Sequence, residues 1–335
     1  MRVFVTGATG LVGGHTALAL LLAGHDVRLL VRSEAKARHY FDPHGFASLD
    51  CVVADMTDTQ AVASALEGCD AVVHAAVRLE LSPLLAKEVY TDNTRSIDAV
   101  IGTAVKAGIR NILWVSSTSI FFNRIAVNAR ADETDETSPL GTLTSAYVRS
   151  KRDGELQVRR LQAQGAPVQI SYPGVVVGPD DPGLSESNRA LRAWVKSVPR
   201  TSSGIQVVDV RDLALIHCHL LENPHLGDPE DARYIVAGHY HEWSQFHALL
   251  QTVCGHKIAH PRLPGPFMRG LGRVLDVYRR VHPFETAISA EAMAVMTQAN
   301  PASSNRVLDR TGIEFRSSAE TLRDTVRWLM VTRAE

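Results

Sequence analysis

Tyr147 and Lys151 stand four residues apart in the stretch YVRSK, and their types suggest proton transfer. At this spacing on a helix, two side chains share one face. A phenol with a pKa near ~10 is a poor acid or base at neutral pH, but a neighbouring ammonium favours the phenolate and lowers that pKa. Such a phenol could protonate a carbonyl oxygen as a hydride arrives, or deprotonate the alcohol in reverse. Because such a pair also arises by chance, it needs a second, independent signal.

The second signal is the glycine-rich stretch TGATGLVG at residues 6–13, which lies between an apolar run and a segment of helical composition. Its spacing is GxxGxxG. Glycine permits a tight turn, a close approach of the main chain to a pyrophosphate, and close packing of helix on sheet. The pyrophosphate would then meet free N–H groups at a helix N-terminus. The residues expected around a bound dinucleotide diphosphate are Gly7, Thr9, Gly10, Leu11, Val12 and Gly13.

The end of the expected second strand bears on which dinucleotide binds. An acidic residue there bonds a ribose 2′-hydroxyl and favours NAD, whereas a nearby arginine accommodates the 2′-phosphate of NADP. The strand reads RLLVRS, so Val31 and Arg32 stand where an acid would be expected. A guanidinium can hold a phosphate through charge-assisted bonds. We therefore expect NADP as the cofactor, with NAD as the alternative.

The elements that must position these groups alternate between strand and helix patterns. Short apolar runs predict strands at 2–6, 27–31, 51–54, 71–76, 112–117 and 168–178, and helices are expected at about 57–67 and 86–107. This alternation predicts a doubly wound α/β fold, a parallel sheet of the Rossmann type. The length of 335 residues suggests more than one unit. We expect a dinucleotide-binding domain from 1–178 with 204–227, and a smaller interleaved substrate lobe from 179–203 with 228–335.

Composition restricts the partners and the location. With 45% hydrophobic and 21% charged residues, the chain is typical of a soluble globular protein. The net charge of −1 argues against nucleic acid or an anionic membrane as the main partner. The four cysteines show no CxxC spacing, which suits a reducing compartment. The apolar run at 17–23 is shorter than the ~20 residues of a bilayer span, so a cytoplasmic protein without a membrane segment is expected.

Several motifs together resemble the extended short-chain dehydrogenases/reductases, the NAD(P)-dependent epimerase/dehydratase-like enzymes. They occur in the order and spacing of that family: TGATGLVG at 6–13, ADMTD at 54–58, HAAV at 74–77, WVSSTSIF at 114–121, YVRSK at 147–151 and DVRDLA at 209–214. Similarity continues through the C-terminal FETAISAEAM and LRDTVRWL segments, so it covers nearly the whole chain. The chain looks closest to the dihydroflavonol-reductase and 3β-hydroxysteroid-dehydrogenase-like branch.

The resemblance implies roles for further residues near the reaction. Ser117, the second serine of SSTSI, would be catalytic, since a hydroxyl at the carboxyl end of a parallel strand could bond the substrate oxygen and stabilise its developing charge. Thr118 is the alternative, because the register of this motif is loose. The family likeness also implies that Lys151 bonds the nicotinamide ribose, and that Asn93 orients the cofactor side of the site.

The expected cofactor site extends to other motifs by the same resemblance. Asp55 and Met56 match the adenine-contacting pair of the family, although DMTD would also cap the helix that follows. His74 stands where the family usually has Asn. We expect it to line the cofactor trough through its main chain rather than to act in catalysis. The remaining expected contacts are Ala75, Ala76, Tyr172, Pro173 and Val175.

The stretch after the sixth strand bears on the substrate. Nucleotide-sugar enzymes of this family typically carry Arg-x-x-Asn-x-x-Gly there, but YPGVVVGP puts Tyr172 and Val175 in place of the Arg and the Asn. This departure favours NADP-dependent reduction of a ketone or aldehyde, or oxidation of the alcohol, on a bulky, fairly apolar molecule. A nucleotide-sugar epimerase or dehydratase is the alternative. A non-catalytic NADP sensor is disfavoured because the Tyr–Lys pair is intact.

Other features receive structural interpretations. Two histidine pairs, at 239 and 241 and at 256 and 260, lack a carboxylate or cysteine at ligand spacing, so no metal site is expected. The basic, amphipathic stretch at 267–281 could suit a membrane surface or a partner groove, but a lobe helix with its arginines in water is favoured. The acidic stretch at 131–137 is expected to be a solvated loop above the site. A homodimer through helices at 86–107 and 145–163 is an expectation from the family.

Overall fold

The fold is given by a computed structural model of the chain. It describes residues 1–79, 83–121, 130–133, 145–279, 282, 284 and 288–331. Parts of three sequence features lie outside these residues: 134–137 of the acidic stretch, 280 and 281 of the basic stretch, and 285–287 of the C-terminal similarity. None of the helices in the described part of the chain is long and apolar enough to cross a lipid bilayer.

Within the described residues, seven strands form one large sheet whose neighbours all pair in parallel. Their spatial order is β3 (Asp50–Val53), β2 (Asp26–Val31), β1 (Arg2–Thr6), β4 (Ala71–His74), β5 (Ile112–Val115), β6 (Val168–Pro173) and β9 (Arg233–Val236). Short runs of Val, Ile and Leu suit such strands because both faces of a parallel sheet are covered. The order turns back between β1 and β4, where ligands bind beyond the carboxyl ends of the strands. The doubly wound parallel sheet is confirmed.

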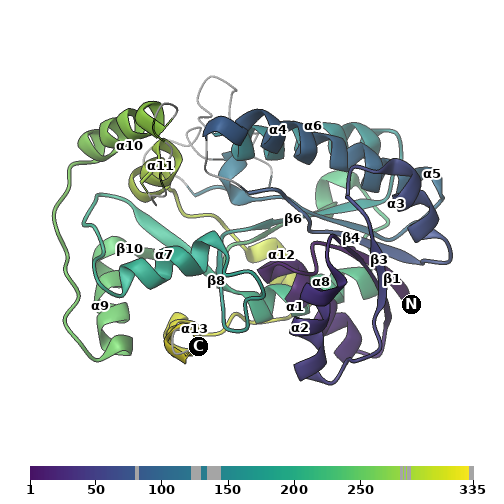
Figure 1. Ribbon diagram of the computed structural model, residues 1–335, viewed down its shortest axis with the longest axis horizontal. Coiled ribbons are helices and arrows are strands. Elements are labelled where there is room, and N and C mark those ends of the chain that lie inside the picture. The colour runs from purple at the N-terminus through teal and green to yellow at the C-terminus, as the bar shows by residue number, and fades with distance from the viewer. Residues whose placement is uncertain are drawn as a thin grey trace.

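Helices cover both faces of the large sheet (Figure 1). One face carries α1 (Leu11–Leu22), α2 (Glu34–Phe41), α8 (Val210–Glu222) and α12 (Asn305–Thr311). The other carries α3 (Thr59–Leu66), α4 (Ala86–Ser96), α5 (Thr103–Lys106) and α6 (Ala146–Ala163), with a π-helical segment at Ile97–Gly102 between α4 and α5. The helix expected at 86–107 is therefore continuous but has a widened turn in its middle. Each face has its own apolar core.

A buried histidine links three elements of the first face. His217 of α8 hydrogen-bonds Thr16 of α1 through Nδ1 (3.0 Å) and Ser171 of β6 through Nε2 (2.9 Å). Burial lowers the pKa of His217 to about 3, so its ring is neutral at ordinary pH. No motif singled out this residue, because its partners come from distant parts of the chain.

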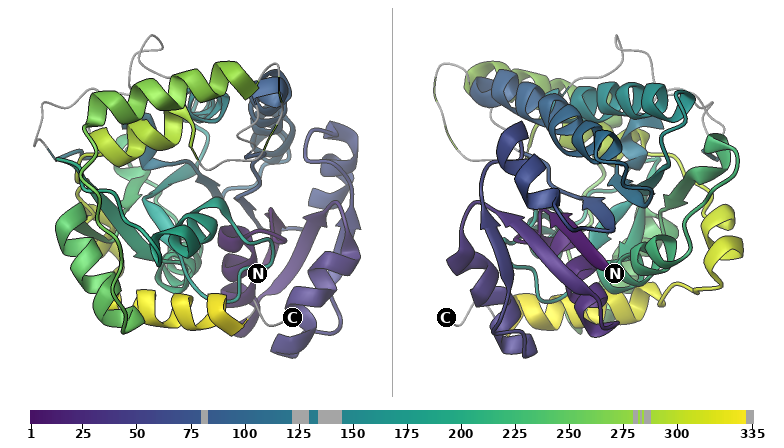
Figure 2. Two further views of the ribbon diagram at one scale, coloured as in Figure 1. Left: turned by 60° about the vertical axis from the view of Figure 1, so that its left-hand side comes forward. Right: turned by 90° about the vertical axis from the view of Figure 1, so that its right-hand side faces the viewer.

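A second, three-stranded sheet lies at the centre of a smaller lobe. Its strands are β7 (Val175–Val177), β8 (Gly204–Asp209) and β10 (His239–Glu242), with β8 parallel to β7 and antiparallel to β10. Around this sheet lie α7 (Glu186–Trp194), α9 (Trp243–Cys254), α10 (Gly265–Arg279), α11 (Ala290–Gln298) and α13 (Ser318–Val331). Figure 2 shows α10 and α11 side by side, at the opposite end of the lobe from α13.

The chain crosses between the two sheets more often than the expected boundaries state. β8 lies in the 204–227 segment but belongs to the small sheet, and β9 lies in the 228–335 segment but is an edge strand of the large sheet. The run expected as one strand at 168–178 divides at Gly174 into β6 and β7, which join different sheets. Local patterning does not distinguish these cases, because a buried strand has the same composition in either sheet.

The turn between β9 and β10 allows a test of how tightly the two sheets meet. Gly238 there has a φ of +72°, and a Cβ on it would overlap the carbonyl of Val207 in β8. Gly255, which ends α9, has a similar φ of +68° but nothing within 4 Å of its Cβ position. We expect Gly255→Ala to lower the free energy of unfolding by about 1 kcal/mol, from the left-handed backbone alone. Gly238→Ala should lower it by a further ~1–3 kcal/mol through overpacking.

Chemical denaturation of both variants beside the parent chain measures this difference. Equal losses in the two variants would contradict the close contact between β8 and the turn at Gly238.

Candidate functional site

The glycine turn has the shape that a bound diphosphate requires. Gly7 has a φ of +80°, and a Cβ on it would lie 2.7 Å from the main-chain nitrogen of Ala76. A Cβ on Gly13 would overlap the carbonyl of Gly7, whereas one on Gly10 would find its nearest neighbour at 3.5 Å. Two of the three glycines are therefore required by close contacts within the turn. Ala75 and Ala76, which follow β4, lie directly against it.

The N-terminus of α1 is open to an anion. Gly10 is its N-cap and offers no side-chain acceptor, and the first turn has no acidic residue. The first N–H groups of a helix have no partner within the helix and attract negative charge. Thr9 and Val12 are half-buried, while the side chain of Leu11 packs in the core, so Leu11 can offer only its main chain. These features fit the diphosphate of a dinucleotide.

A loop that the sequence did not assign to the site lies against this turn. A Cβ on Gly14 would come within 3.3 Å of Pro182, and one on Gly183 would lie 3.5 Å from the carbonyl of Thr9. The buried Asp181 holds the loop through the main-chain nitrogen atoms of residues 183 (3.2 Å) and 185 (2.7 Å). The sequence assigned this segment only to the expected substrate lobe at 179–203. The signal that could have identified it is an aspartate two residues before a glycine, which is typical of a self-bonded turn.

Arg32 and Asp55 lie near each other beyond the ends of β2 and β3. Arg32 is exposed, and it forms no ion pair with any described residue. Asp55 accepts hydrogen bonds from Thr57 N (2.8 Å) and Thr57 Oγ1 (2.6 Å). These bonds, with the nearby charges of Arg32 and Arg78, hold the pKa of the Asp55 carboxyl below its ordinary value. Met56 is half-buried against the apolar core that lies between the large sheet and the helices α3, α5 and α6. Asp55 thus stabilises its own turn, whereas the N-cap of α3 is Asp58, whose side chain accepts from Gln60 N and Ala61 N.

His74 forms part of a buried chain of hydrogen bonds that begins at the glycine turn. The N–H of Ala76 donates to Thr6 Oγ1 (3.1 Å), which also contacts His74 Nδ1 (2.8 Å). On the other side, His74 Nε2 lies 3.1 Å from Ser96 Oγ, and Ser96 donates to the carbonyl of Asn93 (2.8 Å). Since a hydroxyl has one proton, Ser96 must accept from Nε2–H, and Nδ1 accepts from Thr6. The ring is therefore a neutral connector.

The pKa of His74 agrees with this assignment. Burial, with a smaller effect from the charge of Lys151, lowers it to about 3. His74 reaches the groove only through its neighbours, since its own side chain is buried and bonded on both nitrogen atoms.

The side chain of Asn93 joins the loop after β4 to α6. Its Oδ1 accepts from Arg78 N (2.7 Å), and its Nδ2 donates to Arg78 O (3.0 Å) and to Ser150 Oγ (3.0 Å). Ser150 in turn donates to the carbonyl of Tyr147 (2.7 Å). Both amide protons of Asn93 are thus used within the protein. Asn93 positions α6 and the loop rather than presenting a donor to a ligand.

Lys151 is a buried ammonium at the carboxyl end of β5. Its Nζ donates to the carbonyl of Val115 (2.6 Å) and lies 5.4 Å from the centre of the Trp114 ring. Burial lowers the pKa of Lys151 from 10.5 to about 7. A cavity of about 10 Å³ lies beside it, bordered also by His74, Asn93 and Ser150. Space for about one water molecule thus lies beside Lys151.

Tyr147 lies in the first turn of α6 and is half-buried, one helical turn before Lys151 and on the same face. The N-cap Ser145 begins the helix by accepting from Val148 N (3.0 Å). Because α6 runs back along the sheet after its N-terminus, this first turn lies at the carboxyl edge of the strands. The edge also carries the glycine turn.

The structure distinguishes the two hydroxyls that follow β5. Thr118 is buried and donates to the carbonyl of Pro173 (3.1 Å), so its proton holds the end of β6. Ser117 is half-buried, and its Oγ accepts from Ser119 N (3.2 Å). Among the described residues nothing accepts the Ser117 proton. The geometry therefore leaves Ser117, and not Thr118, with a proton for a ligand.

Tyr172 faces the core instead of the groove. Its side chain is fully buried, and its hydroxyl donates to Glu155 (2.6 Å) between β6 and α6. Burial raises the pKa of Glu155 to about 7, against the bond from Tyr172 and the charge of Arg233. Only the main chain of Tyr172 could contact a cofactor. Val175 is half-buried in β7 and packs against the apolar core of the lobe.

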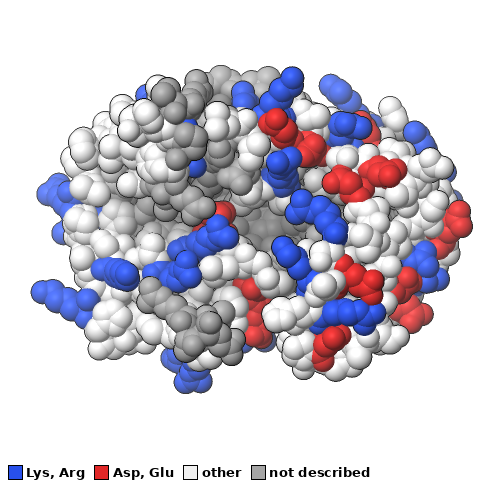
Figure 3. All heavy atoms as spheres, in the orientation of Figure 1, with Lys and Arg blue, Asp and Glu red and all other residues white. Residues whose placement is uncertain are grey.

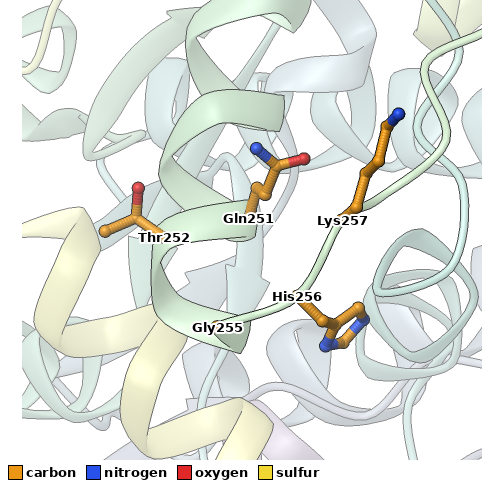
Figure 4. Close-up of a pocket in the computed structure, with 5 residues that line it drawn as sticks. All are labelled: Gln251, Thr252, Gly255, His256 and Lys257. Carbon is orange, nitrogen blue, oxygen red and sulfur yellow. The ribbon is translucent and has the colours of Figure 1, made fainter.

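An open hollow of about 480 Å³ lies away from these residues, at the end of α9 (Figure 4). It is bordered by Gln251, Thr252, Gly255, His256 and Lys257. The ring of His256 already contacts the carbonyls of Cys254 and Val195, and Gln251 accepts from Ile258 N. Figure 4 shows Lys257 extending away from His256. These polar groups hold the turn after α9, and no chemistry follows from them.

One cluster of potential metal ligands occurs among the described residues. His25, Cys218 and Glu222 have ligand atoms within 4.8 Å of one another, at the amino edge of the large sheet. His25 Nε2 lies 3.0 Å from Glu222 Oε1, which Cys218 also contacts at 3.7 Å. Hydrogen bonding accounts for this arrangement. The sequence did not point to it, because His25 is distant from α8 along the chain.

The chain is similar to known proteins along most of its length. A model of the NAD dependent epimerase/dehydratase family matches residues 3–237. The chain is 29% identical over 259 residues to the dihydroflavonol 4-reductase of Dianthus caryophyllus, covering 70% of this chain and 68% of that protein. It is 24% identical over 334 residues to the sterol demethylase protein B of Methylococcus capsulatus, covering 98% of each.

Among solved structures, the UDP-glucose 4-epimerase from Bifidobacterium longum in complex with NAD+ and UDP has the same fold. The TM-score is 0.74 at 17% identity, with 99% of each chain covered. The family match runs from the first strand of the large sheet to the end of β9. The chain therefore belongs to the NAD-dependent epimerase/dehydratase family, and it is an NAD(P)-dependent enzyme of the short-chain dehydrogenase/reductase type.

Proposed function

We propose that the protein is an NADP-dependent oxidoreductase that interconverts a ketone or aldehyde and its alcohol on a bulky, fairly apolar small molecule. The observation that carries this proposal is the fixed position of Lys151. Its ammonium donates to the carbonyl of Val115, which lies two residues before Ser117 in the chain. Lys151 itself lies one helical turn after Tyr147 in α6. Tyr147, Lys151 and Ser117 all belong to elements at the carboxyl edge of the sheet, where this fold binds its ligands, and this supports a joint role in proton transfer.

These residues manage the proton and the charge of the reaction. Tyr147 donates a proton to the carbonyl oxygen during reduction and removes it from the alcohol in the reverse direction. Lys151 favours the phenolate of Tyr147 by its charge. The hydroxyl of Ser117 donates to the same substrate oxygen and stabilises the charge that develops there. NADP supplies or accepts the hydride when it is bound.

The cofactor preference rests on Arg32. Its guanidinium is exposed at the end of β2, without an ion pair to any described residue, and Val31 and Arg32 leave no carboxylate at the end of that strand. The position thus offers a cation for a 2′-phosphate and no acid for a 2′-hydroxyl. The diphosphate would bind at the first N–H groups of α1, between Gly10 and Gly13.

The expected substrate is less polar than a nucleotide sugar. Tyr172 and Val175 replace the polar pair that would contact a sugar diphosphate, and neither presents a charge to the groove. The names of two relatives refer to a dihydroflavonol and to a sterol, which carry no diphosphate. The nucleotide-sugar alternative is supported by the description of the family model and by likeness of fold to solved epimerases.

Removing the phenol hydroxyl should stop the chemistry and leave cofactor binding intact. We expect Tyr147→Phe to lower kcat by ~10²–10⁴ because general acid catalysis is lost. NADPH oxidation in the presence of aromatic ketones, steroids, aldehydes and nucleotide sugars identifies the substrate, and NADPH titration measures binding. Turnover of nucleotide sugars alone, or full activity in Tyr147→Phe, would contradict the proposed function.

The neighbouring hydroxyls provide a matched control for the same assay. Ser117→Ala should lower kcat by ~10²–10³, as the loss of one donor to a developing oxyanion does. Thr118→Ala should mainly reduce stability, by about 1 kcal/mol, because its bond to Pro173 is structural. The reverse pattern would move the donor role to Thr118.

Replacing Arg32 should change the cofactor preference. We expect Arg32→Ala to weaken NADPH binding by about 10–100-fold, the value of charge-assisted bonds to a phosphate, and to leave NADH binding nearly unchanged. Arg110→Ala is the matched control, since Arg110 is exposed at the amino edge of the sheet, before β5. Calorimetric titration of both coenzymes measures the effect. A parent chain that binds NADH more tightly than NADPH would contradict the assignment.

The pKa of Lys151 predicts a pH dependence. Because burial lowers it to about 7, the ammonium is present below that pH and is lost above it. For carbonyl reduction, kcat/KM should therefore fall about tenfold per pH unit above pH ~7. In Lys151→Met, this limb of the pH profile, the fall of kcat/KM above pH ~7, should be absent.

Glu155→Gln tests whether Lys151 or Glu155, a second buried group with a pKa of about 7, causes the fall in kcat/KM. Glutamine can still accept from Tyr172, so the packing is kept, and the limb should persist in this variant. If the limb disappeared in Glu155→Gln and remained in Lys151→Met, Glu155 would be the titrating group.

A further inference from the structure

The outer face of α10 presents large apolar side chains to solvent. Phe267, Val274 and Val277 are 59%, 64% and 61% exposed, and Leu271 and Tyr278 are also exposed. Spacings of three and four residues place these side chains along one stripe of the helix. Exposed apolar residues scattered singly are ordinary, but a continuous stripe of five indicates a binding surface.

Packing against α11 fixes which face of α10 points outward. Met268, Gly272 and Arg279 are buried on the inner face. A Cβ on Gly272 would come within 2.6 Å of the carbonyl of Ser289, so the two helices are in close contact there. α10 therefore has little freedom to rotate its apolar stripe inward.

Two arginines of α10 and one in the segment that leads into the helix lack acidic partners among the described residues. Arg262 and Arg273 are exposed and Arg269 is half-buried, and among the described residues none of the three forms an ion pair. The acidic Asp276 is used on the inner side, where it accepts from Ala290 N (2.9 Å). In the view of Figure 3, the left-hand edge of the molecule, on the side of α10, shows Lys and Arg but no Asp or Glu.

The structure thus modifies what the sequence favoured for this helix. The stretch at 267–281 was interpreted as a lobe helix with its arginines in water. Arg273 is exposed as expected, but Arg279 is buried beside Asp276, and Phe267, Val274 and Val277 are open to water as well. Periodicity showed that the helix is amphipathic, but it did not show which side packs on α11.

We propose that this stripe is a docking surface for an anionic phospholipid membrane. An apolar helical face with basic residues at its margin is the arrangement that lies in a bilayer interface, with the apolar side chains in the headgroup and acyl boundary. Anionic lipids would neutralise Arg262 and Arg273. A second copy of the chain fits less well, because a two-fold contact through the stripe would bring the arginines of both copies together. The proposal does not depend on the proposed reaction.

Flotation with vesicles of phosphatidylcholine and phosphatidylglycerol in equal parts tests the proposal on the full chain. The parent protein should float with these vesicles at low salt, and less at high salt or with pure phosphatidylcholine. Phe267→Glu combined with Val274→Glu should lower the bound fraction by about tenfold or more, because two apolar side chains no longer enter the interface.

The matched control is Leu22→Glu combined with Leu226→Glu. These leucines are 71% and 78% exposed on other surfaces, so the control adds the same charge and removes similar apolar area. Its vesicle binding should stay within about twofold of the parent, as expected when the altered side chains lie outside the interface. NADPH binding and thermal melting show that both double variants are folded.

Two outcomes would overturn the proposal. One is a parent protein that does not float with anionic vesicles. The other is a concentration-dependent dimer in sedimentation velocity that only the α10 variant loses, without vesicle binding by the parent. That second result would assign the stripe to a contact between copies of the chain.

Discussion

A buried ammonium is costly to the fold unless a strong acceptor meets it, and the carbonyl of Val115 is that acceptor for Lys151. The contact requires α6 to lie close to β5. Gly154 permits this approach, since a Cβ there would lie 3.2 Å from the Trp114 ring. The same approach sets the first turn of α6, with Tyr147, over the carboxyl edge of the sheet. The close packing of α6 on β5 thus sets both the position of Lys151 and, through burial, its lowered pKa.

A line of polar contacts connects this helix to the glycine turn. It runs from the N–H of Ala76 through Thr6, His74, Ser96 and Asn93, and from Asn93 through Ser150 to the carbonyl of Tyr147. Its members are buried where an unmet donor or acceptor would cost about 1–3 kcal/mol, so the chain resists displacement. The place for a diphosphate and the place for proton transfer are therefore held in register by the protein itself.

Much of this could be predicted from the sequence, because short apolar runs, glycines and the YVRSK stretch act locally. The parallel, doubly wound sheet followed from the alternation of strand and helix patterns. The direction of Tyr172 into the core did not, since a strand residue can face either side and its partner Glu155 lies on another element. Likewise, the position of the loop around Asp181 depends on contacts between distant segments. The same holds for β8, which joins the small sheet, and for β9, which joins the large one.

Neutral histidines at the centre of the fold couple its folding equilibrium to protons. His74 and His217 have pKa values of about 3 in the native protein but would return to ordinary values near 6.5 once exposed. Unfolding between these values therefore takes up protons at both rings, and stability present above pH ~6.5 declines as the pH falls. The burial that keeps both rings neutral thus also makes the protein sensitive to mild acid.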